Sequence, residues 1–216
     1  MKIVVLEGSP NKVGSSNLLA DNFVRGAEEA GHSVQIIDVA HANIHPCTGC
    51  IHCGYEGPCV QKDDVEEIRQ MILAADMLVF VTPLYYYGMS AQLKVMIDRF
   101  CAFNSSIQRK RMKSALLTVA WNSDNWTFDA LQAHYQTLVR YLNLEDMGMV
   151  LGRGCGSPAM TQQSRFSPLF GYTIIWWNGL FGFGTGFLIA WTYYLSGHWQ
   201  KKSAIQSQSI NYQESF

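Results

Sequence analysis

Short runs of apolar residues alternate along the chain with segments in which apolar residues recur every three or four positions. The runs are rich in β-branched residues and predict strands that are buried on both faces of a sheet. The other segments predict helices with one apolar face. The predicted strands are 3–6, 34–37, 77–81, 115–120 and 146–151, and the predicted helices are 18–31, 63–72, 91–101 and 128–142. This alternation of strands and helices predicts an α/β protein with an open, parallel sheet.

Loops of unusual composition follow the carboxyl ends of the first four predicted strands. Loops 9–17, 83–89 and 121–123 are polar or aromatic, and the loop after the second strand carries most of the cysteines. Ligands of open α/β sheets bind beyond the carboxyl ends of the strands, which lie along one edge of the sheet. We therefore expect these loops, and with them the cysteine sulfurs, to share this edge.

The loop 9–17 lies between the first predicted strand and the start of the following helix. It offers serine hydroxyls, asparagine side chains and backbone N–H groups where the helix dipole favours an anion. Its glycines match neither the dinucleotide fingerprint nor the phosphate loop of nucleoside triphosphatases. The pattern suits the phosphate of flavin mononucleotide (FMN), and it equally fits an ordinary helix start capped by Ser15 or Ser16.

Three consecutive tyrosines, Tyr85, Tyr86 and Tyr87, follow the third predicted strand, which Pro83 ends. At the carboxyl edge of the sheet they would offer a flat wall and hydroxyl groups to a planar ring. The alternative is packing or a subunit contact. We expect this alternative to hold for at least one of the three, because successive residues point in different directions.

Four cysteines lie within thirteen residues, in the spacing C-x2-C-x2-C-x5-C, and the glycines and prolines between them favour a tight loop. Such a loop can turn several sulfurs toward one point, which indicates a [4Fe–4S] cluster, a zinc site or redox-active thiols. His45 and His52 flank the loop and are expected to be exposed. Of the other two cysteines, Cys101 is predicted to lie in the core, and Cys155 is a weaker candidate for the rim of the flavin.

The composition narrows the class of protein. The chain has 216 residues, of which 48% are hydrophobic, so that it can build a sizeable core. Its net charge of −1 does not indicate binding to nucleic acid or to an anionic membrane. The apolar run at the N-terminus is too short for a signal peptide, and we expect the protein in the reducing cytoplasm. The cysteine cluster is then a metal or redox site and not a disulfide framework.

Three groups of residues together resemble a known family. They are Gly8-Ser9-Pro10, the loop from Cys47 to Cys59 followed by Asp63-Asp64, and Thr82-Pro83-Leu84-Tyr85 with Leu93-Lys94 and Ile97-Asp98-Arg99. Over about residues 1–160, the chain resembles the flavodoxin-like NAD(P)H-dependent FMN reductases, in particular the branch that includes the iron–sulfur flavoproteins.

The resemblance implies a flavodoxin-like sheet with strand order 2-1-3-4-5, helices on both of its faces, and FMN at the strand ends. The residues implied for the phosphate are Ser9, Asn11, Ser15, Ser16 and Asn17. Those implied for the isoalloxazine ring are Pro83, Leu84, Tyr85, Tyr86, Tyr87, Gly88, Trp121 and Asn122. Those that match the ligands of a [4Fe–4S] cluster are Cys47, Cys50, Cys53 and Cys59. Homo-oligomers are usual in the family.

The sequence changes character near its C-terminus, where residues 166–216 contain only three charged side chains. Residues 169–195 contain none, are long enough for a helix across a bilayer, and have aromatic clusters at both ends. Five glycines and Asn178 weaken such a helix. We therefore predict a flavodoxin-like FMN-binding domain over 1–165 and a hydrophobic segment over 166–216. The segment is a candidate transmembrane helix, a buried or oligomer-forming tail, or an aberrant C-terminus that replaces the usual last helix.

The leading hypothesis is an FMN-dependent oxidoreductase that transfers electrons from NAD(P)H or a ferredoxin-like donor to a quinone, a flavin or another small acceptor. The alternatives are a non-enzymatic flavin and iron–sulfur electron carrier or redox sensor, and a zinc-stabilised interaction module. The sequence shows no convincing acid–base pair, and we assign no catalytic residue. The expected location is the cytoplasm, with the C-terminal segment as a candidate membrane tether.

Overall fold

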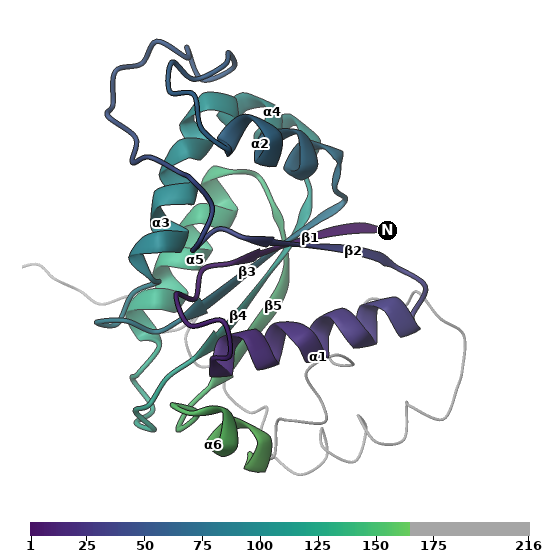
Figure 1. The fold of residues 1–216 in the computed structure, drawn as a ribbon, viewed down its shortest axis with the longest axis vertical. Helices are drawn as coiled ribbons and strands as arrows, with labels where there is room; N and C mark the ends of the chain where they lie inside the picture. Colours follow the sequence, from purple (N-terminus) through teal and green to yellow (C-terminus); the bar gives the residue numbers. More distant parts are fainter. Residues whose placement is uncertain (165–216) are drawn as a thin grey trace, which may run out of the picture. The chain divides into compact units, whose positions relative to one another are not determined.

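The computed structural model describes residues 1–164 of the chain. Within them, parallel strands form one sheet (Figure 1). The strands are β1 (Lys2–Glu7), β2 (Ser33–Asp38), β3 (Met77–Pro83), β4 (Lys113–Val119) and β5 (Glu145–Gly152). Their order is β2-β1-β3-β4-β5, which confirms the predicted flavodoxin-like α/β fold and its strand order.

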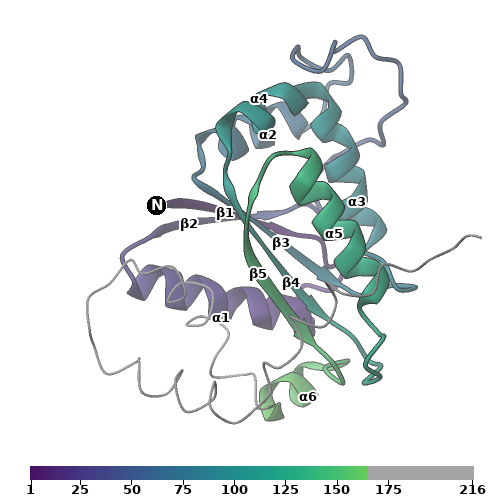
Figure 2. The same cartoon turned by 180° about the vertical axis from the view of Figure 1, so that it is seen from behind.

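Helices cover both faces of the sheet (Figures 1 and 2). They are α1 (Ser15–Glu29), α2 (Val65–Ala74), α3 (Ala91–Asp98), the 3₁₀ helix η1 (Arg99–Phe103), α4 (Asn104–Lys110), α5 (Asp129–Tyr141) and α6 (Pro158–Gln163). Apolar residues of α2, α3, η1, α4 and α5 form one core with the strands, and those of α1 form a second core on the opposite face. Successive residues of β1 pack alternately into the two cores, because the side chains of a strand point alternately to its two faces.

The predicted helix 91–101 is shorter in the structure, because α3 ends at Asp98 and the backbone tightens into η1. The turn of η1 directs Arg99 inward, where its side chain is 1% exposed and bonded to Asp63. The same turn brings Cys101, which was predicted to lie in the core, to the wall of a pocket under the cysteine loop. The core prediction for Cys101 is therefore corrected, since the residue is half-buried.

The predicted hydrophobic segment 166–216, with its candidate membrane span 169–195, lies outside the described residues. Over residues 1–164, none of the helices combines the length and the apolar character that a membrane crossing requires.

Candidate functional site

The start of α1 leaves two buried hydroxyl groups without partners. The helix begins at Ser15 after Gly14, and no side chain caps its first turn. Ser15 and Ser16 are 6% and 1% exposed, and within residues 1–164 neither Oγ has a hydrogen-bond partner. A buried hydroxyl without a partner is costly, and here it lies beside the free N–H groups of a first helical turn. An anion bound at this point would satisfy both kinds of donor.

Ser9 and Asn11 give the preceding loop its shape. Ser9 Oγ accepts a hydrogen bond from the Asn11 N–H at 3.2 Å and donates one to the Asn11 carbonyl at 3.0 Å. The side chain of Asn11 accepts from the N–H of Val13 at 3.2 Å. These side chains are engaged within the loop, so Ser15 and Ser16 supply the hydroxyl donors that remain for a ligand.

Asn17 connects the loop to Glu7 at the end of β1. Its Nδ2 donates to Glu7 Oε2 at 3.0 Å, while its Oδ1 is buried without a partner in the described part of the chain. Glu7 is 8% exposed. Burial raises the pKa of the Glu7 carboxyl, the hydrogen bond from Asn17 opposes this shift, and the charges of Asp21 and Asp38 add to it.

The variant Glu7→Gln is expected to be more stable than the wild type at neutral and alkaline pH. Because the pKa of Glu7 is raised in the folded state, the unfolded state loses its proton first as the pH rises. Stability therefore falls between the ordinary pKa and the raised one, and a glutamine does not suffer this loss. Its Oε1 still accepts from Asn17.

Thermal unfolding of the two proteins at pH 4 and pH 8 checks this prediction, with Glu28→Gln on the exposed side of α1 as the matched control. We expect a gain in Tm at pH 8 that shrinks at pH 4, and no such pattern in the control. An equal or lower Tm of Glu7→Gln at pH 8 would contradict the account of Glu7.

The loop after β3 is a tight hairpin turn built from tyrosines. Tyr85 and Gly88 exchange two backbone hydrogen bonds of 3.0 Å, and Tyr86 and Tyr87 between them have φ of 45° and 65°. Two central residues with positive φ define a turn that normally takes asparagine and glycine, and bulky residues adopt it only under strain. Tyr86 is fully exposed, at 103%. Such strained, exposed rings occur at ligand sites, where the surroundings hold them in place.

The loop after β4 extends this aromatic wall. The ring of Trp126 packs on Tyr87, with 5.2 Å between the ring centroids. Trp121 is 72% exposed, and its ring lies directly on Gly156, where a Cβ would come within 2.0 Å of it. The sequence prediction missed Trp126, although an aromatic residue in the same loop as Trp121 was the available signal. Asn122, which was predicted to face the ring of a cofactor, uses its Oδ1 to accept from the N–H of Asp124.

Backbone contacts bring these three loops to one edge of the sheet, at the carboxyl ends of the strands (Figure 1). Gly8 donates to the carbonyl of Val81 at 2.9 Å, and its own carbonyl accepts from Ser90 Oγ at 2.5 Å. Leu84, which follows the buried Pro83, donates to the carbonyl of Val119 at 2.8 Å and so ties the tyrosine turn to β4. The loops 9–17, 83–89 and 121–123 thus share one edge, as predicted.

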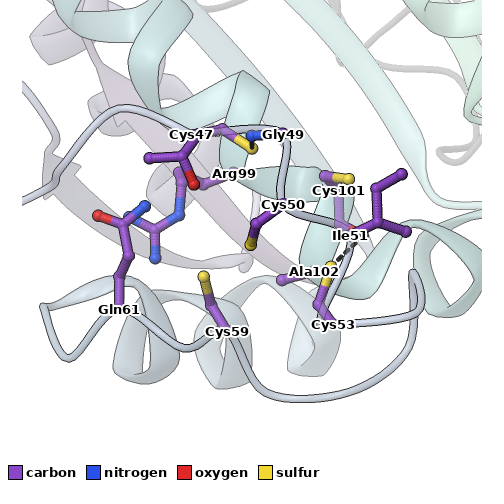
Figure 3. Close-up of a pocket in the computed structure, with 11 residues that line it drawn as sticks. Cys47, Gly49, Cys50, Ile51, Cys53, Cys59, Gln61, Arg99, Cys101 and Ala102 are labelled. Carbon is purple, nitrogen blue, oxygen red and sulfur yellow. Dashed lines mark hydrogen bonds between the residues drawn. The ribbon is translucent and has the colours of Figure 1, made fainter.

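The cysteine loop bends sharply and gathers its thiols around one pocket (Figure 3). Positive φ angles at Gly49, Ile51, Gly54 and Tyr55 turn the chain. The thiols that line the pocket are those of Cys47, Cys50, Cys53, Cys59 and Cys101. The Cys53 thiol also donates to the carbonyl of Cys101 at 3.7 Å.

The chemistry of these thiols suits a soft metal. The backbone N–H of His52, together with the side chains of His52 and Thr48, lowers the pKa of Cys50 to about 7. Burial, with Cys53 and Cys47 nearby, raises the pKa of Cys101 to about 11. In residues 1–164, no three His, Cys, Asp or Glu side chains stand close enough together to hold a metal ion. The four motif thiols thus line one pocket, but in the described part of the chain they are not drawn together as the ligands of a metal ion.

The position of the pocket differs from the sequence prediction. The loop leaves the carboxyl end of β2, as expected, but it projects beyond α2, α3 and α4 (Figure 1). The pocket is floored by Arg99, Cys101 and Ala102 of η1, and none of its lining residues comes from the other three loops. Ser90, which contacts Gly8, stands at the opposite end of α3, and a helix of 8 residues is about 12 Å long. The prediction that the sulfurs share the edge of the flavin loops is therefore corrected: within one chain, the thiol pocket lies apart from these loops.

Of the remaining candidates, the two histidines belong to the cysteine loop and its base, and Cys155 lies in the core. His45 is exposed, as expected, and its Nδ1 lies 3.3 Å from Asp63 Oδ2. His52 is also exposed. Cys155 is fully buried in the core against α1, and its thiol donates to the carbonyl of Arg153 at 3.5 Å. Cys155 is therefore not available for contact with a flavin at the carboxyl edge of the sheet.

Comparison with known proteins yields relatives of two kinds. An iron-sulfur flavoprotein of Archaeoglobus fulgidus is 34% identical over 103 residues, which cover 48% of this chain and 47% of the relative. The iron-sulfur flavoprotein MJ1083 of Methanocaldococcus jannaschii is 37% identical over 99 residues, which cover 46% of this chain and 51% of the relative. The chain thus spans about half the length of these curated relatives.

A longer match is found with YwqN of Bacillus subtilis, whose name describes an NAD(P)H-dependent FMN-containing oxidoreductase. It is 30% identical over 162 residues, which cover 71% of this chain and 86% of YwqN. Among solved structures, the NAD(P)H:quinone oxidoreductase of Methanothermobacter marburgensis has a TM-score of 0.63 at 18% identity, over 78% of this chain and 95% of that chain, and shares the fold. Residues 1–150 match the model of the family described as NADPH-dependent FMN reductase. The chain therefore belongs to the NADPH-dependent FMN reductase family.

Proposed function

We propose that this chain binds FMN at the carboxyl edge of its sheet and acts as an oxidoreductase. The observation that carries the proposal is the pair of buried, unpartnered hydroxyls of Ser15 and Ser16 at the start of α1. A doubly acidic phosphate at this point would accept from both hydroxyls and from the N–H groups of the first helical turn. Membership of the family supports the same cofactor.

In this proposal, the first loop holds the phosphate and the aromatic loops hold the ring of FMN. Ser15 and Ser16 donate to the phosphate, Asn17 stands beside them, and Ser9 and Asn11 keep the loop in shape. The ring lies against the residues of the aromatic loops, and Trp126 packs on one of them, Tyr87. These residues are Pro83, Leu84, Tyr85, Tyr86, Tyr87, Gly88, Trp121 and Asn122. FMN supplies the transfer of a hydride or of single electrons, and the protein supplies binding and orientation.

We propose NAD(P)H or a ferredoxin-like protein as the electron donor, and a quinone, a flavin or another small molecule as the acceptor. The name of YwqN, which includes NAD(P)H, and the quinone oxidoreductase of the same fold support these classes. The exposed aromatic residues of the edge, which are Tyr85, Tyr86, Tyr87, Trp121 and Trp126, offer a surface for a planar acceptor or for a second copy of the chain in a homo-oligomer. We take residues 1–165 as the domain that carries this function.

For the cysteine loop, we propose that Cys47, Cys50, Cys53 and Cys59 hold a [4Fe–4S] cluster. Their shared pocket and the names of the iron-sulfur flavoproteins among the relatives support this assignment. Zinc and free thiols are the other states that four clustered thiols permit. Cluster and flavin would lie at different ends of α3 in one chain, a helix about 12 Å long.

The test is anaerobic purification of the full chain after expression with added iron and riboflavin. We expect about one FMN per chain, about four irons per chain, and steady oxidation of NAD(P)H when a quinone is supplied. Flavin that is reduced only by a ferredoxin-like donor, without turnover, would favour the electron carrier instead. A protein that binds no FMN, either as purified or on titration, would refute the proposed function.

Cysteine variants separate the cluster from the flavin. In Cys50→Ser, we expect the iron content to fall by more than half while FMN remains bound, since the pocket and the flavin edge share no residue. Cys155→Ala, which removes a thiol buried in the core far from the pocket, is the matched control and should keep its iron. Retention of full iron content in Cys50→Ser would contradict the cluster assignment.

A further inference from the structure

Arg99 is a fully buried arginine at the base of the cysteine loop. It lies on η1, and its guanidinium binds the equally buried carboxylate of Asp63 at two points, Nη1 to Oδ2 at 2.5 Å and Nη2 to Oδ1 at 3.1 Å. A charged pair of this kind persists in the interior only when both partners find further hydrogen bonds.

Those further bonds join the two ends of the cysteine loop. Arg99 Nη1 also donates to the carbonyl of His45 at 2.7 Å, and Asp63 Oδ2 accepts from the N–H of His45 at 3.0 Å. His45 precedes the first cysteine of the loop, and Asp63 follows the last. One ion pair therefore clamps the chain on both sides of the four thiols.

Two neighbouring hydrogen bonds close the same stem at its surface. Asn43 N–H donates to Asp64 Oδ2 at 2.7 Å, and Gln61 Nε2 donates to the carbonyl of Pro46 at 2.9 Å. Both bonds involve exposed groups, for which water competes as a hydrogen-bond partner. The buried pair is the part of the stem that water does not reach.

The guanidinium also lies at the wall of the thiol pocket, beside Gln61 (Figure 3). Burial lowers the pKa of Arg99, while the hydrogen bonds and the charge of Asp63, followed by those of Cys59, raise it above its ordinary value. The Nε of Arg99 is buried and has no partner within residues 1–164. A permanent positive charge with a spare donor thus stands next to a sulfur of the motif.

We propose that Arg99 is the positioning residue of the cysteine loop: with Asp63 it holds the two ends of the loop together, and it places a fixed positive charge beside Cys59. The part that concerns a bound cluster rests on the proposed function. A cluster with four thiolate ligands becomes more negative on reduction, and a nearby cation stabilises that state. Arg99 then makes the cluster easier to reduce.

Two variants test the positioning role without leaving a lone charge in the interior. Arg99→Lys keeps the positive charge and loses the two-point geometry. Arg99→Met combined with Asp63→Asn removes both charges and keeps an oxygen that accepts from the backbone. Thermal unfolding checks that each variant folds. If Arg99→Lys does not fold, the double variant alone is used for the measurements.

The first measurement is amide hydrogen exchange of the metal-free protein over residues 43–65. We expect exchange about tenfold faster in both variants, because charge-assisted hydrogen bonds close the stem. The matched control is Arg109→Lys, whose guanidinium pairs with Glu56 of the same loop at 2.5 Å but is 63% exposed. Exposed pairs contribute little, and exchange in this control should change less than about twofold. Unchanged exchange in both Arg99 variants would overturn the positioning role.

The second measurement is the reduction potential of the iron-loaded protein. We expect a more negative potential in the double variant, and a potential near that of the wild type in Arg99→Lys, which restores the charge. A purely structural role would not produce this rescue, and equal potentials in all three proteins would overturn the role of the charge. If the wild type takes up no iron, the cluster proposal fails and the exchange measurement alone decides on Arg99.

Discussion

Replacing Ser15 by aspartate is expected to lower the affinity for FMN by about 1000-fold. The new carboxylate would stand where the buried hydroxyl now lies without a partner, beside the position proposed for the phosphate. Two unit charges about 4 Å apart repel by about 4 kcal/mol at an effective dielectric constant of about 20. This corresponds to about a 1000-fold change in the dissociation constant. Fluorescence titration of FMN with the apoprotein measures the effect.

Two further variants show whether the effect belongs to this site. Ser15→Ala removes one donor to the phosphate without adding a charge, and we expect it to weaken FMN binding by about tenfold. Ser33→Asp introduces the same charge at an exposed serine at the opposite end of the sheet and should leave the affinity unchanged. The start of α1 accommodates an acidic residue well, so the Ser15→Asp protein should fold. FMN binding of wild-type strength by this folded variant would exclude the phosphate site at α1.

Replacing Gly8 by alanine is expected to destabilise the domain by about 3 kcal/mol, the upper part of the range for overpacking. A Cβ at this position would lie 2.5 Å from Leu93 Cβ and 2.9 Å from Ser90 Oγ. Both neighbours are fully buried, and Ser90 Oγ donates to the carbonyl of Gly8, so they cannot withdraw without breaking this bond. In a domain of this size, the change lowers the Tm by about 10 °C.

Thermal unfolding of the FMN-free protein checks the effect of Gly8→Ala. The matched control is Gly88→Ala, because a Cβ there would meet only the carbonyl oxygen of Tyr85, at an ordinary contact distance of 3.8 Å. We expect the control to change the Tm by less than about 2 °C, which is within the range of surface substitutions. Equal Tm values for the wild type and Gly8→Ala would mean that β1 and α3 do not approach as closely as described.

The sequence alone supports the architecture because buried parallel strands have a local signature. The central strands β1, β3 and β4 contain continuous buried apolar runs, whereas the edge strands β2 and β5 are more exposed. The amphipathic segments between the strands specify crossover helices that cover both faces of the sheet. The same local pattern determines that loops 9–17, 83–89 and 121–123 meet at one edge. The sequence missed α4, since a helix of seven residues with two buried positions carries little periodic signal.

The details of the flavin edge depend on contacts between loops. The spacing of residues identifies Ser15 and Ser16 as candidates, but only their burial without partners distinguishes them from Ser9 and Asn11, which bond within the loop. The strained turn of Tyr86 and Tyr87 is not encoded in turn residues such as asparagine or glycine. The packing of Trp126 on Tyr87 joins two loops that are far apart in the sequence.

The cysteine loop shows the same division. The sequence by itself determined the thiol set, since the spacing of Cys47, Cys50, Cys53 and Cys59 is a local property of one loop. Only the tertiary structure decided where the thiols lie, which is over η1 and not along the flavin edge. It also revealed the clamp of Arg99 and Asp63, which are 36 residues apart. Local patterns specify strands, helices and motifs, whereas a buried ion pair forms only after the fold has brought distant residues together and removed them from water.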